Sequence, residues 1–253
     1  MINKAILIMI FLITTSSMVF ANQISFDNYP YRLPHQNQSF SESKKLMKKV
    51  YYDNQVSFYC NCKYEYKHIK GKERTVVIPS SCGYIPRKNP ERGKYVEWEH
   101  IVPAHTFGHT RQCWREPICA KSDGKKYKGR KCCERVDQVF RAMQADMYNL
   151  VPAVGELNAD RSNYQFSIIN GEKREYGKCD FEVENKIAEP KEDIRGDIAR
   201  TYFYMEHTYG ITISDKQRKL FQIWNNLDPV SQWERIRAER IKNIQGNTNI
   251  FIK

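Results

Sequence analysis

The sequence predicts a mixed α+β fold, and three observations support this prediction. One helical segment is followed by short strand-like segments, then by a strand, a long loop and a further helix, and the last third of the chain is helical. Strands and helices do not alternate regularly, which argues against a parallel βαβ architecture. The chain has 253 residues, a length that suits one domain with a substantial core.

Residues 1–21 have the pattern of a secretory signal peptide. Lys4 precedes the apolar run Ala5–Ile13, and small residues lead to a cleavage motif that ends at Ala21. The alternative is a membrane anchor, but the run is short compared with the roughly 20 apolar residues of a span. We expect cleavage after Ala21 and a single domain over residues 22–253. This domain is expected to be exported to the periplasm or the medium, without stable membrane insertion.

The first half of the mature chain contains the predicted strands. Residues 22–40 are polar with two prolines and suggest an irregular arm, and a helix follows with Ser41 as its N-cap. The later elements, in order, are strand-like segments at 57–69 and 74–79, a turn at 86–94, and a strand at 94–103 that ends at Pro103.

The second half is mainly helical. Residues 104–134 form a long insert without clear periodicity, and such loops are usually functional or disordered. Helices are predicted within 137–150, 151–163, 192–210, 214–227 and 228–246. Gly210 closes the third of these, Ser214 caps the fourth, and Asp228 with Pro229 opens the fifth. The stripe Ile194, Ile198, Tyr202 and Met205 is interpreted as core.

The charge of the chain favours a polyanionic partner. Lys and Arg number 41 against 29 Asp and Glu, which gives a formal net charge of +12. Such an excess attracts nucleic acid, anionic lipid or acidic glycan, although a soluble protein with a merely cationic surface has the same composition. The run Lys121–Lys131 within the insert concentrates six of the cations against one Asp.

The cysteines indicate disulfides. There are eight, an even number in a chain expected to be exported: Cys60, Cys62, Cys82, Cys113, Cys119, Cys132, Cys133 and Cys179. Structural zinc is the alternative, but the chain lacks a C-x-x-C pair. Adjacent cysteines seldom bridge each other, so Cys132 and Cys133 are expected to have separate partners.

Two segments carry residues suited to phosphodiester chemistry. Glu99 and His100 combine a hard oxygen ligand with a group that titrates near neutral pH, and they fall where a strand ends. A surface Glu beside a half-buried His is the alternative. The segment 146–167 contains Asn149, Asn158 and Asn163, which are either turn and cap residues or neutral metal ligands.

These motifs together resemble the endonuclease I family of bacterial periplasmic and secreted nucleases. The resemblance rests on EWEHIVPA, FGHTRQCW, GRKCC, DMYNLVPAVGELNADRSNYQFS, RGDIARTYFYM and the C-terminal block from WNNLDPVSQWER, in this order over about residues 41–253. It implies a ββα-metal core and cleavage of DNA, and often RNA, with little sequence preference. Mg²⁺ is the implied cofactor, with Mn²⁺ or Ca²⁺ as substitutes, and we expect a monomer.

The resemblance also implies roles for individual residues. His100 is the implied general base, Glu99 and Asn149 are the implied metal ligands, and Arg130 is the implied phosphate-binding residue of the loop. Lys125, Lys126, Lys128 and Lys131 are expected to bind phosphates of the substrate. His105 and His109 are interpreted as structural, because one base suffices. A binding protein without catalysis and a secreted toxin or metal-binding scaffold remain as alternatives.

Overall fold

The computed structural model describes residues 35, 37 and 39–253. The expected signal peptide, residues 1–21, and most of the expected arm, residues 22–40, lie outside the described residues. The described chain is a mixed helix-and-sheet structure with four disulfides, which confirms the predicted α+β class. Across 39–253, no helix has both the length and the apolar character needed to cross a membrane.

Helix α1, Phe40–Val50, begins earlier than predicted. Its N-cap is Ser39 rather than Ser41, and the side chain of Ser39 accepts a hydrogen bond from the backbone N–H of Glu42. This start makes Phe40 the first helical residue. The buried face of α1 packs against helices α6 and α10.

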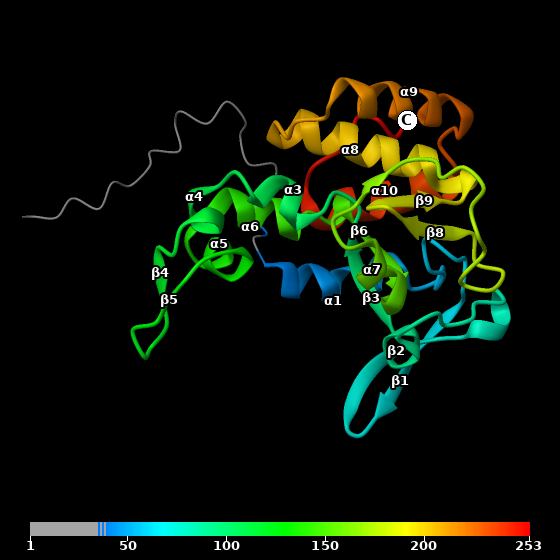
Figure 1. Cartoon of the computed structure of the whole chain (residues 1–253), viewed down its shortest axis with the longest axis horizontal. Coiled ribbons are helices and arrows are strands. Elements are labelled where there is room, and N and C mark those ends of the chain that lie inside the picture. Colours follow the sequence, from blue (N-terminus) through cyan, green and yellow to red (C-terminus); the bar gives the residue numbers. More distant parts are fainter. Residues whose placement is uncertain (1–34, 36, 38) are drawn as a thin grey trace, which may run out of the picture. The chain divides into compact units, whose positions relative to one another are not determined.

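Strands β1, Tyr64–Ile69, and β2, Lys72–Val77, form an antiparallel hairpin that projects from the rest of the chain (Figure 1). The strand predicted from Ser57 begins later, because Cys60 and Cys62 are tied into disulfides and the chain turns there. The short helices η2 (Pro79–Ser81) and α2 (Pro90–Gly93) follow. Helix α2 lies in the predicted turn.

The centre of the fold is a strand pair followed by a helix. Strand β3, Val96–His100, pairs antiparallel with β6, Leu150–Val154, and α7, Gly155–Arg161, follows directly. Sequence reasoning missed β6, since a short apolar run fits a strand or a buried helix equally well. Strand β3 also ends before Pro103, at His100.

The insert after β3 folds into short elements closed by two disulfides. These elements are α3 (Ala104–Gly108), α4 (Gln112–Arg115), β4 (Cys119–Ala120), β5 (Lys126–Tyr127) and α5 (Arg130–Val136). The disulfides are Cys113–Cys133 and Cys119–Cys132, which confirms separate partners for the adjacent cysteines. The other two disulfides are Cys60–Cys179 and Cys62–Cys82. The β4–β5 hairpin extends away from α5 (Figure 1).

The helix predicted within 137–150 is shorter in the structure. Helix α6 spans Gln138–Ala145, and its N-cap Asp137 accepts the N–H of Phe140. The chain turns at Asp146 into the 3-10 helix η3, Met147–Asn149. The turn frees the last carbonyl groups of α6 for partners outside the helix.

A small sheet and three helices complete the chain. The sheet consists of β7 (Gln165–Phe166), β9 (Ile187–Pro190) and β8 (Phe181–Glu184), in that spatial order, and was not predicted. After η4 (Glu192–Ile194) come α8 (Arg195–Tyr209), α9 (Asp215–Leu227) and α10 (Gln232–Gln245), with α8 and α9 side by side (Figure 1). The cap of α10 is Ser231, which forms a capping box with Glu234, rather than Asp228 and Pro229.

The core connects these elements behind the end of β3. Buried apolar side chains from α1, α6, β6, α8 and α10 form one cluster, with Met47, Phe140, Leu150, Met205 and Ile241 among its members. The stripe of α8 predicted as core is buried. Ile101 and Val102, which follow β3 directly, belong to the same cluster, so the end of β3 is joined to the core.

Candidate active site

The end of β3 brings Glu99 and His100 to one cavity. Neighbouring residues of a strand normally point to opposite faces. Here the strand ends at His100, whose partner across the sheet is Leu150. Glu99 and His100 line the same cavity, which has a volume of about 490 Å³. The lining residues are Phe40, Lys44, Arg92, Val96, Glu97, Trp98, Glu99, His100, Arg130 and Asn158.

His100 is buried and held in one orientation. Its ring Nε2 lies 2.8 Å from the carbonyl oxygen of Gln144, which can only accept, so Nε2 donates and Nδ1 carries the lone pair. The ring of Phe40 lies against it, with 4.6 Å between the ring centroids. Burial, reinforced by the nearby charge of Arg130, lowers the pKa of His100 to about 3. The imidazole is therefore neutral at neutral pH.

Glu99 is buried beside a cation. Arg161 Nη1 lies 2.9 Å from Glu99 Oε1, and the hydroxyl of Tyr59 donates to the same oxygen at 3.3 Å. Burial raises the pKa of Glu99 to about 7, although Arg161 acts in the opposite direction. Arg161 also donates to the carbonyl oxygens of His100 and Ile101. It therefore fixes the end of β3, a role that sequence reasoning did not assign.

Asn149 does not reach the cavity. Its side chain is fully buried, and both ends of its amide bind the backbone of Val102. The carbonyl oxygen accepts from Val102 N–H at 2.7 Å, and the NH₂ donates to Val102 oxygen at 3.0 Å. The structure therefore does not bring the expected metal ligand together with Glu99, since this amide fastens the chain after β3.

Asn158 lies where Asn149 was expected. It belongs to α7, lines the cavity with Glu99 and His100, and donates from Nδ2 to Glu97 Oε2 at 2.7 Å. Arg92 binds both oxygens of Glu97 at 2.7 Å. Among the residues that the structure describes, none donates a hydrogen bond to the carbonyl oxygen of the Asn158 side chain. Asn158 was one of three asparagines considered in the segment 146–167, and no sequence pattern distinguished it from the other two as a candidate ligand.

Arg130 is the first residue of α5 and reaches the same cavity. Its Nε donates to Gln144 Oε1 at 3.2 Å, and its guanidinium carbon lies 5.2 Å from the centroid of the Phe40 ring. Its Nη2 is buried and lacks a hydrogen-bond partner among the described residues. Such an unsatisfied donor is costly unless an anion or water meets it.

The other expected substrate contacts lie outside the cavity. Lys125 and Lys126 are exposed on the β4–β5 hairpin, Lys128 donates to the carbonyl of Arg115, and Lys131 pairs with Glu134. None of these lysines lines the cavity. The rings of His105 and His109 stack on each other 4.9 Å apart and also lie outside it. Three cations line it: Arg130 was predicted as a site residue, whereas Lys44 and Arg92 were not.

Comparison with known proteins finds relatives over most of the chain. The family model of Endonuclease I matches residues 37–253. An extracellular deoxyribonuclease of Aeromonas hydrophila is 44% identical over 224 residues, which covers 87% of this chain and 92% of that protein. A periplasmic deoxyribonuclease of the same species is 42% identical and covers 85% and 86%. An extracellular ribonuclease of Bacillus subtilis (strain 168) is 32% identical over 126 residues, covering 42% and 43%. The chain belongs to the endonuclease I family.

Proposed function

We propose that this protein is an exported, Mg²⁺-dependent endonuclease that hydrolyses phosphodiester bonds of DNA, and also of RNA. The observation that carries the proposal is the convergence of His100, Glu99, Asn158 and Arg130 on one cavity. Family membership and the names of the deoxyribonuclease relatives support the reaction, and the more distant ribonuclease supports RNA as a second substrate. Strands β3 and β6 pair antiparallel and α7 follows β6, and we propose that these three elements form the ββα-metal core expected from the sequence.

His100 is the proposed general base. Its neutral ring has its proton on Nε2, where the carbonyl of Gln144 holds it, and its lone pair on Nδ1. Water loses a proton to Nδ1, and its oxygen bonds to phosphorus while the bond to the 3′ oxygen breaks. The 3′ oxygen takes a proton from solvent, which leaves 5′-phosphate and 3′-hydroxyl ends. A base in this position contributes a factor of about 10²–10⁴.

Glu99 and Asn158 are the proposed metal ligands in place of the pair Glu99 and Asn149. Among the described residues, the side-chain hydrogen bonds of Glu99 use Oε1, and the NH₂ of Asn158 is turned to Glu97. The cavity is thus offered one carboxylate oxygen and one amide oxygen, which are hard donors of the type that Mg²⁺ prefers. Mg²⁺, when bound, supplies a Lewis acid that stabilises charge on the phosphoryl and leaving oxygens. Mn²⁺ and Ca²⁺ accept the same donors.

Arg130 is the proposed phosphate-binding residue. Its buried Nη2 lacks a partner among residues that the structure describes, and a non-bridging phosphate oxygen would satisfy it. Its Nε remains held by Gln144, which fixes the direction of the guanidinium. Lys125, Lys126, Lys128 and Lys131 are assigned at most a contact with more distant phosphates, since they lie outside the cavity.

Export follows the same proposal. The predicted signal peptide, residues 1–21, together with the extracellular and periplasmic relatives, supports a mature domain over residues 22–253. The mature protein is proposed to act as a monomer on nucleic acid outside the cytoplasm, through phosphate contacts that do not depend on sequence.

The test is a plasmid-nicking assay with Mg²⁺, with EDTA, and with the variant His100→Ala. We expect nicking with Mg²⁺, none with EDTA, and a loss of about 10²–10⁴-fold in the variant. His105→Ala is the matched control, because His105 lies outside the cavity. Intact plasmid in every lane of correctly oxidised protein would refute the proposal.

A further inference from the structure

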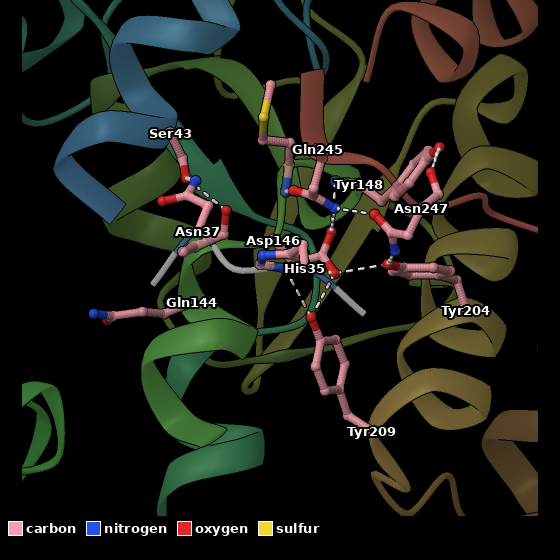
Figure 2. A network of polar contacts seen from close by, with 12 residues as sticks. His35, Asn37, Ser43, Gln144, Asp146, Tyr148, Tyr204, Tyr209, Gln245 and Asn247 are labelled. Carbon is pink, nitrogen blue, oxygen red and sulfur yellow. Dashed lines mark hydrogen bonds and ion pairs between the residues drawn. The ribbon is translucent and has the colours of Figure 1, made fainter. Parts of the chain in front are cut away.

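A buried polar cluster is centred on Asp146, two residues after Gln144 (Figure 2). One carboxylate oxygen, Oδ2, accepts from the hydroxyls of Tyr204 at 2.7 Å and Tyr209 at 2.6 Å. The other, Oδ1, accepts from the backbone N–H of Tyr148 and from Gln245 Nε2, both at 2.9 Å. The function proposed above uses none of these groups, although Asp146 is fully buried.

His35, which precedes α1, is a further member of this cluster. His35 Nε2 lies 3.6 Å from Asp146 Oδ2 and 3.2 Å from the hydroxyl of Tyr209, and both side chains of the His35–Asp146 pair are inaccessible to solvent. The hydroxyl of Tyr209 gives its proton to Asp146, so it accepts from His35. His35 therefore fastens the chain before α1 to the turn after α6 (Figure 2).

A second contact joins α1 itself to the end of α6. The hydroxyl of Ser43, in the first turns of α1, donates to the carbonyl oxygen of Ala145 at 2.6 Å. Asn37 Nδ2 in turn donates to Ser43 Oγ at 2.8 Å. Two successive residues at the end of α6 are thus bound by residues in or before α1: Ala145 by Ser43 and Asp146 by His35.

The residue before these two holds the candidate site. The carbonyl oxygen of Gln144 fixes the ring of His100, and its side-chain oxygen fixes Arg130 Nε. Phe40, at the start of α1, lies against the His100 ring and beneath the Arg130 guanidinium. The start of α1 therefore contacts His100 directly through Phe40. His35 and Ser43 contact the end of α6, where Gln144 binds His100.

We propose that His35 is a positioning residue of the active site, which sets the orientation of His100 and Arg130 through Asp146 and Gln144. This inference deepens the proposed function and rests on it. A displacement of about 1 Å at a reacting group can cost about 10²-fold in rate. His35 touches no substrate, so its loss should lower turnover and leave substrate binding almost intact.

The test compares two substitutions of His35 in the oxidised, exported protein. We expect His35→Ala to lower kcat for plasmid nicking by about 10- to 100-fold, with KM changed less than about threefold. His35→Gln, whose Nε2 can donate at nearly the same place, should recover most of the turnover. Equal losses in both variants, or a loss confined to KM, would overturn the positioning role.

The matched control is Arg240→Ala. Arg240 fastens the other end of α1, where it donates to the carbonyl of Val50 and pairs with Asp53. We expect this variant to retain wild-type kcat when each protein is assayed well below its melting temperature. A loss like that of His35→Ala would mean that any weakening of α1 lowers activity, and it would refute the specific role of His35.

A second readout does not depend on activity. The Nε2 proton of His100, bound to the Gln144 carbonyl, should give a slowly exchanging ring signal in ¹⁵N-detected NMR, assigned by its absence in His100→Gln. We expect the signal to shift or broaden in His35→Ala and to persist in Arg240→Ala. An unchanged signal in His35→Ala would overturn the inference about His35, whatever the activity of the protein. Failure of the wild-type protein to cleave nucleic acid would overturn only the proposed function.

Discussion

The side-chain amides of Asn149 and Asn158 have different roles because they meet different partners. The oxygen and the NH₂ of the Asn149 side chain each form a hydrogen bond with the backbone of Val102. Among the described residues, the side chain of Asn158 forms one hydrogen bond, from its NH₂ to Glu97, and Asn158 lines the cavity. The same residue type therefore serves as a backbone fastener in one place and as a candidate ligand in the other.

Substitution of the two asparagines should separate stability from activity. We expect Asn149→Ala to lower the free energy of unfolding by about 1–3 kcal/mol, since two backbone groups of Val102 lose their partners. Asn158→Ala should leave unfolding nearly unchanged but raise the Mg²⁺ concentration needed for nicking by about tenfold or more. Chemical denaturation and Mg²⁺ titration of nicking measure the two effects, and the reverse pattern would restore Asn149 as the ligand.

Glu182 should make stability depend on pH. It is only 3% exposed, and burial raises its pKa to about 7, against a lowering by Arg174. Between about pH 4.5 and 7 the folded state keeps a proton that the unfolded chain releases, so stability falls as pH rises through this window. Relative to wild type, Glu182→Gln should gain about 1–3 kcal/mol between pH 5 and pH 8. Urea unfolding at both pH values is the measurement, and a constant difference would contradict the assignment.

At the scale of elements, the Cys-rich insert presents Arg130 to the cavity. Helix α5 begins at Arg130 and contains Cys132 and Cys133, which are fastened to Cys119 and Cys113. Before α5 the insert contains only the short elements α3, α4, β4 and β5, and these cross-links restrict their arrangement. The position of Arg130 thus depends on covalent closure as well as on packing.

Two disulfides of equal loop length allow a matched comparison. Cys113–Cys133 and Cys62–Cys82 each span a sequence separation of 20. Replacing either pair by serine should cost a similar free energy of unfolding, about 3 kcal/mol, because the loop entropy is the same. Only the loss of Cys113–Cys133 should also raise KM and lower kcat, by displacing Arg130. Nicking kinetics with melting curves provide the test, and equal activity losses would argue against a local effect on Arg130.

At the scale of the whole molecule, the charge of +12 suits a substrate that carries one phosphate per nucleotide. The cavity itself holds several cations, but Lys125 and Lys126 lie beyond it on an exposed hairpin. Contacts of this kind add affinity without sequence preference, and added salt weakens them.

Salt dependence should reveal which lysines meet phosphate. We expect the affinity for DNA to fall with salt, and Lys125→Ala with Lys126→Ala to reduce the slope of log K against log salt by about 0.9 for each contact removed. The control is the pair Lys216→Ala and Lys219→Ala on α9, which removes equal charge from an exposed helix. Fluorescence anisotropy with Ca²⁺ in place of Mg²⁺ measures binding. Equal slopes for the two double variants would exclude a specific role for the hairpin.

Much of the fold could be predicted from local sequence patterns. The stripe of α8, the caps at Gly210 and Ser214 and the class of the fold depend on neighbours within a few residues, and all are confirmed. Short elements without a period of their own were missed, such as β6 and the small sheet β7–β9–β8, because only their pairing partners make them strands.

By itself the sequence determined the α+β class, the family, and the closeness of Glu99 to His100, since adjacent residues at a strand end cannot lie far apart. Only the tertiary structure decided that Asn158, rather than Asn149, shares their cavity, that Arg161 pairs with Glu99, and that His35 lies beside Asp146. The physical reason is that a hydrogen bond between distant segments leaves no local pattern. Each amide or imidazole acquires its role from the groups that folding places beside it.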